Sequence, residues 1–138
     1  MSSRKRAREA ERWLKTAKED YDVSMLLYEN ERYAHCCFLS QQAAEKAVKA
    51  LYYWMDREAW GHSILELLIG LEDEIGEIST LKEEAALLDK FYIPTRYPDG
   101  LPALTPAQIY TKKEAEIALK AAEKILRFSS SFLKIPLF

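Results

Sequence analysis

Apolar residues recur every three or four positions along most of the chain, a spacing that places them on one side of an α-helix. The first stripe runs from about residue 5 to residue 29, and the second from residue 33 to about residue 56. The two stripes consist of Ala10, Trp13, Leu14, Ala17, Tyr21, Met25 and Tyr28, then Tyr33, Cys37, Phe38, Ala44, Val48, Leu51, Tyr52 and Met55. Only residues 30–32 separate them, and so short a link favours antiparallel neighbours. The pattern predicts two long amphipathic helices.

Two shorter helices are expected next. Residues 63–66 (Ser-Ile-Leu-Glu) have the spacing of a capping box, which predicts a third helix that runs to about Ile75 and ends at Gly76. Residues 80–83 (Thr-Leu-Lys-Glu) repeat the capping spacing and predict a fourth helix. Its buried side would consist of Leu81, Ala85, Leu88, Phe91 and Tyr92.

Proline then interrupts the helical pattern. The segment from residue 94 to residue 106 contains Pro94, Pro98, Gly100, Pro102 and Pro106. This density excludes a long regular helix and indicates a shaped loop, with a turn at residues 97–100.

A last helix is expected from residue 111 to about Ser129, with a capping box formed by Thr111 and Glu114. The apolar tail at residues 132–138 either packs over the helices or binds a partner, and packing is favoured. No alternating pattern long enough for a strand is present. We therefore expect an all-α fold, an antiparallel up-and-down bundle of four to five helices. It would form a single domain over residues 1–138, with a core over about residues 8–130.

The charge balance limits the kinds of ligand to consider. The formal net charge is -2, so the chain as a whole does not attract phosphate backbones or anionic lipid, and any nucleic-acid contact must be local. The first fifteen residues are nonetheless basic, with Arg4, Lys5, Arg6, Arg8, Arg12 and Lys15 against Glu9 and Glu11. This basic start is interpreted either as a frayed, solvated helix end, which is favoured, or as a contact for RNA.

The two cysteines, Cys36 and Cys37, are adjacent on a predicted helix, where bridging would be strained, so they are expected to be buried thiols. His35 is the only nearby histidine, and we expect neither a metal nor another cofactor. The N-terminus lacks an apolar signal core and no stretch is long enough to span a membrane, which predicts a cytoplasmic protein.

The run of residues 41–53 (Gln-Gln-Ala-Ala-Glu-Lys-Ala-Val-Lys-Ala-Leu-Tyr-Tyr) mixes polar side chains with small and apolar ones. Gln42, Glu45, Lys46 and Lys49 lie three or four residues apart, which indicates either a solvated face or a seam between helices; the seam is favoured. The alanines of this run permit close approach of another helix, and the aromatic residues that follow are of a kind enriched where subunits meet. These residues are Ala43, Ala44, Ala47 and Ala50, then Tyr52, Tyr53, Trp54 and Trp60. We expect a homodimer that uses the second helix and the loop after it.

Arg57 and His62 are candidates for chemistry, since only four residues, which include Gly61, separate them at the end of the second helix. An imidazole that titrates near neutral pH can move a proton while a guanidinium holds a phosphate, which is enough for metal-free cleavage of RNA through its 2′-hydroxyl. Such a spacing also arises by chance, and a histidine before a helix start often only caps or packs.

Residues 41–53, Arg57, His62 and the segment 95–100 (Thr-Arg-Tyr-Pro-Asp-Gly) occur in an order that resembles the HEPN family of small helical nucleotide- and RNA-associated domains. The resemblance extends over about residues 10–130. It implies that Arg57 and His62 match the arginine and histidine of the family's metal-independent ribonucleases, whose active cleft forms between two copies. Glu58 departs from the residues that usually follow the arginine in active members, so we favour binding over catalysis.

The resemblance also implies a partner. Relatives with this helix and an Arg-Tyr-Pro-Asp turn are often encoded beside a minimal nucleotidyltransferase, as toxin and antitoxin or as catalytic and substrate-binding halves. We expect a nucleotide or RNA to bind near Arg57, His62, Arg96, Tyr97 and Lys46. Tyr97 would stack on a base and Arg96 would meet a phosphate.

Two alternatives remain from the sequence. One, which is favoured over contact with a nucleotide, assigns Arg96 only a structural role, as an ion-pair partner of Glu45 or Asp89 that fixes the loop. The other describes the whole protein as a non-enzymatic helical bundle that binds another protein.

Overall fold

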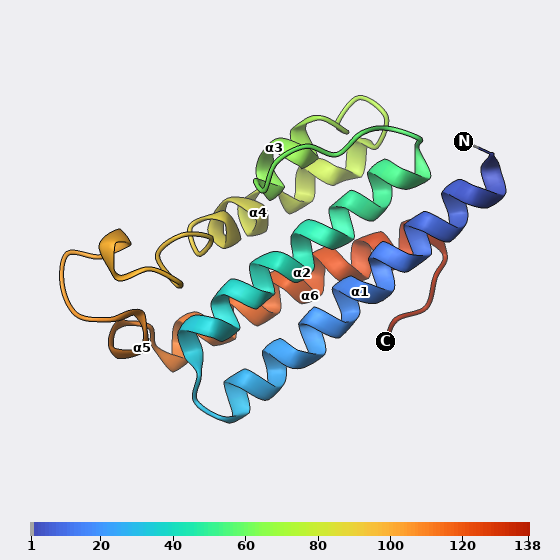
Figure 1. The fold of residues 1–138 in the computed structure, drawn as a ribbon. Helices are drawn as coiled ribbons and strands as arrows, with labels where there is room; N and C mark the ends of the chain where they lie inside the picture. The colour runs from blue at the N-terminus through green and yellow to red at the C-terminus, as the bar shows by residue number, and fades with distance from the viewer. Residues whose placement is uncertain (1) are drawn as a thin grey trace.

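The computed structural model describes residues 2–138, and its three longest helices lie side by side (Figure 1). They are α1 (Ser3–Glu29), α2 (Tyr33–Trp54) and α6 (Lys112–Leu133), and each packs against the other two. α1 and α2 run antiparallel, and α6 runs in the direction of α2 (Figure 1). Since residues 2–138 contain no strand, the all-α fold predicted from the sequence is confirmed.

A second group of short elements covers the other side of α2. It consists of α3 (Ile64–Ile69), the 3₁₀-helix η1 (Gly76–Leu81) and α4 (Lys82–Asp89). α3 and α4 pack against each other and against α2, and α4 also contacts α6. α4 returns along the bundle antiparallel to α2 (Figure 1), so this segment takes the place of the third helix of an up-and-down bundle. The connection to α6 contains the 3₁₀-helix η2 (Pro98–Gly100) and the short helix α5 (Pro106–Ile109).

Alanines make the close approach of the long helices possible. Four alanines of α2 are completely buried: Ala43, Ala44, Ala47 and Ala50. They face the helices of their own chain, so the close packing predicted for a second subunit is used inside the bundle. Tyr52, expected on a subunit surface, is also part of the core with 5% exposure, and its hydroxyl donates to the carbonyl of Leu67 at 2.6 Å. Trp54 and Trp60 remain exposed.

The ends of α1 and α6 follow from their capping residues. The hydroxyl of Ser2 accepts a hydrogen bond from the amide of Lys5 at 3.2 Å, so the basic start is helical from Ser3 onwards, and residues 2–5 are exposed to solvent. At α6, Thr111 and Glu114 form the predicted capping box.

The apolar stripes are mostly buried as predicted, and the tail packs against the core. Met25 is the exception in α1, because it is 41% exposed. The tail turns back after α6 and runs beside α1 (Figure 1), where the ring of Phe138 meets that of Tyr21 edge-on at 5.7 Å. This contact confirms the packing interpretation of residues 132–138.

The predicted third helix is too long. α3 ends at Ile69, and turns at residues 70–74 replace the rest of the helix expected up to Ile75, before η1 begins at Gly76. Leu71, Ile75 and Ile78 are buried at steps of four and three residues, although no α-helix carries them. Successive turns thus reproduce the apolar spacing of a helix, which explains the error.

The predicted cap of the fourth helix is also wrong. The hydroxyl of Thr80 donates to the carbonyl of Glu77 at 2.8 Å inside η1, so it does not cap α4. α4 begins directly where η1 ends, and Leu81 at its start makes no side-chain capping bond.

The proline-rich segment forms a shaped loop with more helical structure than predicted. The expected turn at residues 97–100 is present as η2. α5 adds a single helical turn with Pro106 at its start, where the missing amide hydrogen costs nothing. Thr105 and Gln108 form its capping box.

Cys36 and Cys37 are both completely buried, as predicted, and neither forms a disulfide. Burial raises the pKa of both thiols. None of the helices described over residues 2–138 combines the length and apolar character needed to cross a membrane.

Candidate functional site

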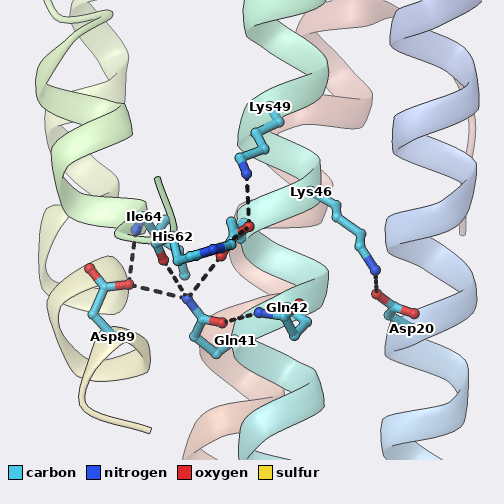
Figure 2. Close-up of polar contacts among 9 residues, drawn as sticks. Asp20, Gln41, Gln42, Lys46, Lys49, His62, Ile64 and Asp89 are labelled. Atoms are coloured by element: carbon cyan, nitrogen blue, oxygen red, sulfur yellow. Dashed lines mark hydrogen bonds and ion pairs between the residues drawn. The ribbon is translucent and has the colours of Figure 1, made fainter. Parts of the chain in front are cut away.

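Gln41 holds the loop before α3 against α2. Its side chain is completely buried, and Nε2 donates to the backbone carbonyl of His62 at 2.8 Å. The same nitrogen lies 3.4 Å from Oδ1 of Asp89 and 3.5 Å from Oε1 of Glu45, while Oε1 accepts from Nε2 of Gln42 at 2.8 Å (Figure 2). A buried amide that finds partners for both its ends fixes the position of the backbone it binds.

Asp89, at the end of α4, holds the same loop from the other side. Its Oδ1 accepts from the amide of Ile64 at 2.8 Å, and its Oδ2 accepts from the amide of Leu65 at 3.1 Å and from the hydroxyl of Ser63 at 2.9 Å. The hydroxyl of Ser63 caps α3 as predicted, since it accepts from the amide of Glu66 at 3.1 Å. The carboxylate that satisfies the free amides of α3 comes from Asp89, however, and not from within residues 63–66.

Glu45 places the imidazole of His62. The side chain of Glu45 is 5% exposed, and its Oε2 lies 3.0 Å from Nζ of Lys49 and 3.3 Å from Nδ1 of His62. Lys49 supplies the positive charge that a buried carboxylate requires. Because an ionised carboxylate only accepts hydrogen bonds, it favours a proton on Nδ1 and leaves Nε2 of the half-exposed ring available to a ligand.

Tyr92 joins His62 to Arg96. The imidazole and the Tyr92 ring stack with centroids 4.9 Å apart and an interplanar angle of 18°. The guanidinium of Arg96 lies 4.5 Å from the Tyr92 and Phe38 ring centroids and 5.1 Å from that of Tyr97. Its Nε donates to the carbonyl of Tyr92 at 2.8 Å.

Arg96 is therefore held by rings and by a carbonyl, and the predicted ion pair with Glu45 or Asp89 is wrong. Within residues 2–138 its two Nη groups have no hydrogen-bond partner. A cation fixed by aromatic faces with free donors is suited to hold a phosphate.

Arg57 lies in different surroundings from His62. Its Nη1 is 2.9 Å from Oε1 of Glu74, and its guanidinium lies over the Tyr52 ring at 5.4 Å. Among residues 2–138, neither a hydrogen bond nor an ion pair joins Arg57 to His62. Gly61, with a φ of +82°, turns the chain between them. Within one chain the structure thus brings His62 together with Arg96, not with Arg57.

Lys46 also points away from His62. Its Nζ lies 2.5 Å from Oδ2 of Asp20 on α1, whereas Glu45 and Lys49 face His62 (Figure 2). The polar run of α2 is therefore a seam, as predicted, with one side facing α1 and the other facing the loop before α3.

Sequence reasoning singled out neither Gln41 nor Tyr92 as a site residue, and it considered Asp89 only as a partner of Arg96. Gln41 lies one helical turn before Glu45, so the i,i+4 spacing was a usable signal. Tyr92 and Asp89 reach the site from the end of α4, and no local pattern pairs them with residue 62.

Metal binding finds no support in the side chains that surround the site. Across residues 2–138, no three His, Cys, Asp or Glu side chains are grouped closely enough to hold an ion. What the arrangement offers is an oriented imidazole, a fixed guanidinium and the exposed ring of Tyr97, all borne by neighbouring segments.

Comparison with known proteins supports the resemblance found in the sequence. A relative from Methanocaldococcus jannaschii, described as "Putative toxin MJ1304", is 27% identical over an alignment of 148 positions, and the alignment covers 91% of this chain and 88% of the relative. The crystal structure of TT1696 from Thermus thermophilus superposes with a TM-score of 0.86 at 45% identity, covering 89% of this chain and 97% of that one.

Two further crystal structures have the same fold. ST0689, described as an archaeal HEPN homologue, has a TM-score of 0.76 and 34% identity, with 91% of this chain and 98% of that one covered. A HEPN domain protein from Thermotoga maritima has a TM-score of 0.72 and 35% identity, with 91% and 99% covered. The family described as "HEPN domain" matches residues 10–132. This chain belongs to the HEPN domain family.

Proposed function

We propose that this protein is a toxin-like HEPN protein that binds a nucleotide or an RNA phosphate beside His62. The observation that carries the proposal is the imidazole of His62, which the buried carboxylate of Glu45 orients and which stacks on Tyr92 next to Arg96. Burying the Glu45 carboxylate costs desolvation free energy. Binding of a ligand, or proton transfer, at the free Nε2 of His62 would explain why the protein orients this imidazole in spite of that cost.

The neighbouring groups supply the other contacts that a nucleotide needs. The free Nη donors of Arg96 would hold a phosphate as a bidentate pair, and the half-exposed ring of Tyr97 would stack on a base. Since the chain has a net charge of -2, such local contacts must provide the affinity.

The toxin-like role and the partner belong to the same proposal. The description of the M. jannaschii relative as a toxin supports the toxin-like role. We propose that the partner is a minimal nucleotidyltransferase, for which this protein acts as the substrate-binding or toxin half in the cytoplasm. We also propose a homodimer, since Trp54 and Trp60 remain exposed at the end of α2 and in the loop after it.

A second candidate function is metal-independent cleavage of RNA. The Glu45–His62 contact favours it, because the carboxylate would stabilise the imidazolium formed when Nε2 takes a proton from the 2′-hydroxyl. Arg57 would then have to release Glu74 to reach the phosphate. RNA incubated with the protein and a chelator should be cut, and a His62→Ala variant that cuts equally well would exclude this role for His62.

Calorimetric titration with ATP and with a short RNA tests the binding proposal. We expect heat with at least one of them, and an affinity at least about tenfold lower in Arg96→Gln, which removes a charge-assisted hydrogen bond worth about 1.5–3 kcal/mol. Arg32→Gln, at the exposed turn between α1 and α2, is the matched control and should bind as the wild type does. No heat with either ligand would overturn the proposal and favour a non-enzymatic bundle that binds another protein.

A further inference from the structure

α4 and α6 enclose an open groove of about 410 Å³ on the outside of the bundle. The two helices pack against each other and against α2 through buried side chains, among them Ala85 and Leu88 of α4 and Ala118 of α6. The groove is lined by Glu83, Glu84, Leu87, Ile117, Lys120, Ala121 and Lys124. Most of these side chains are exposed or only partly buried, so the groove opens to solvent and not toward α2.

The floor of this groove is apolar. Leu87 of α4 is partly buried against the core, whereas Ile117 of α6 is 41% exposed. Ala121 lies one helical turn after Ile117, and its short side chain leaves a recess between the two helices. A large apolar side chain that enters the recess would remove the exposed surface of Ile117 from water, which favours its binding.

The two rims of the groove carry opposite charges. Glu83 and Glu84 lie on α4, and Lys120 and Lys124 lie on α6. Nζ of Lys124 lies 2.9 Å from Oε1 of Glu84 and donates to the carbonyl of Thr80 at 3.2 Å, which closes the groove at the end where α4 begins. Glu83 and Lys120 are exposed, and neither has an ion pair within residues 2–138. The groove therefore presents a free negative charge on one rim and a free positive charge on the other.

We propose that the α4–α6 groove binds an amphipathic helix of a partner protein. Apolar side chains of that helix would enter the groove, cations on one flank would face Glu83, and carboxylates on the other flank would face Lys120. Two helices offer no free backbone edge to which a strand could pair, whereas a third helix fits the groove between them. The eight residues of α4 span about 12 Å, so the contact involves two to three turns of the partner helix. The inference does not depend on the proposed function, because no residue that lines the groove belongs to the site around His62.

Fluorescence anisotropy with three labelled helical peptides of about four turns tests the proposal. The peptides share one apolar stripe and differ in its flanks: a mixed peptide has lysine on one flank and glutamate on the other, a second has lysine on both, and a third has glutamate on both. The mixed peptide should bind about fivefold more tightly than the other two, because each of those brings one flank against a rim of like charge. The difference should shrink at about 0.5 M salt, since exposed charges are then screened.

Charge reversal on either rim should change which peptide binds best. Glu83→Lys makes both rims basic and should favour the glutamate peptide, whereas Lys120→Glu makes both rims acidic and should favour the lysine peptide. Glu29→Lys and Lys5→Glu, at exposed positions of α1, make the same changes in net charge. These matched controls should keep the preference for the mixed peptide.

A charge in the floor of the groove should prevent binding. Ile117→Lys should bind the mixed peptide at least about tenfold more weakly, and it should fold normally because Ile117 is already exposed to solvent. The inference is overturned if the mixed peptide does not bind the wild type, if the controls change the preference as the rim variants do, or if Ile117→Lys binds as the wild type does. It is also overturned if the wild type self-associates and Ile117→Lys does not, because a second copy would then occupy the groove.

Discussion

Replacing Asp89 by alanine removes the carboxylate on which the loop before α3 depends. The variant leaves the amides of Ile64 and Leu65 and the hydroxyl of Ser63 without their acceptor. Loss of a capping carboxylate lowers the free energy of unfolding by about 0.5–2 kcal/mol. Each further polar group left without a hydrogen-bond partner lowers it by about 1 kcal/mol more. Because Asp89 is only partly buried and water can replace some of these contacts, we expect the free energy of unfolding to fall by about 2–3 kcal/mol.

Urea denaturation measures this loss, and thermal melting gives an independent value. For a chain of this length, about 4 °C of melting temperature corresponds to 1 kcal/mol, so Asp89→Ala should melt about 8–12 °C lower. Asp73→Ala, an exposed acid in the turn after α3, is the matched control and should change the free energy of unfolding by less than about 0.5 kcal/mol. If Asp89→Ala is no less stable than this control, then Asp89 does not hold the loop that carries His62.

Three further predictions concern packing, pH and backbone strain. Ala47→Leu forces a larger side chain between α2 and its neighbours and should cost about 1–3 kcal/mol in urea denaturation, whereas the exposed Ala103→Leu should be neutral. Burial raises the pKa of the Cys36 and Cys37 thiols, so their contribution to stability is complete below roughly pH 8.5, where unfolded thiols begin to ionise, and declines as the pH rises further. Unfolding measured at pH 7 and pH 9.5 should show this decline, and a Cys37→Ala variant that declines as steeply would count against it. Leu104 has a φ of +66°, which costs a branched side chain about 1–2 kcal/mol, so Leu104→Gly should raise the melting temperature slightly, and a lower one would contradict the argument.

The long helices were predictable because their apolar period continues over many turns and ends at recognisable residues. Thr111 and Glu114 marked the start of α6 from local spacing alone. The short elements were not predictable in the same way, since Leu71, Ile75 and Ile78 have helical spacing and yet lie on turns and a 3₁₀-helix. A periodic pattern reports which side of a segment is buried, and several backbone conformations satisfy it.

The candidate site was predictable only in part. The spacing of residues 41–53 indicated a polar seam on the second helix, but it did not reveal what the seam binds. Gln41 and Asp89 are 48 positions apart in the chain, and both act on the backbone around His62. Arg96 was placed at the site from the sequence, and its contact with Tyr92 joins residues only four positions apart. The stacking of Tyr92 on His62, however, joins residues from two distant segments of the chain. Long-range contacts of this kind leave no signal in a single sequence.

The imidazole ¹H–¹⁵N spectrum of the protein, titrated with adenosine monophosphate and with a short RNA, measures whether either ligand binds beside His62. The chain contains only two histidines, so His35, exposed at the start of α2, serves as a reference within the same spectrum. We expect saturable shifts of the His62 resonances while those of His35 stay in place, and weaker shifts in Arg96→Gln. Unchanged His62 resonances both at millimolar nucleotide and with the short RNA, or equal shifts of both histidines, would show that neither ligand binds beside His62.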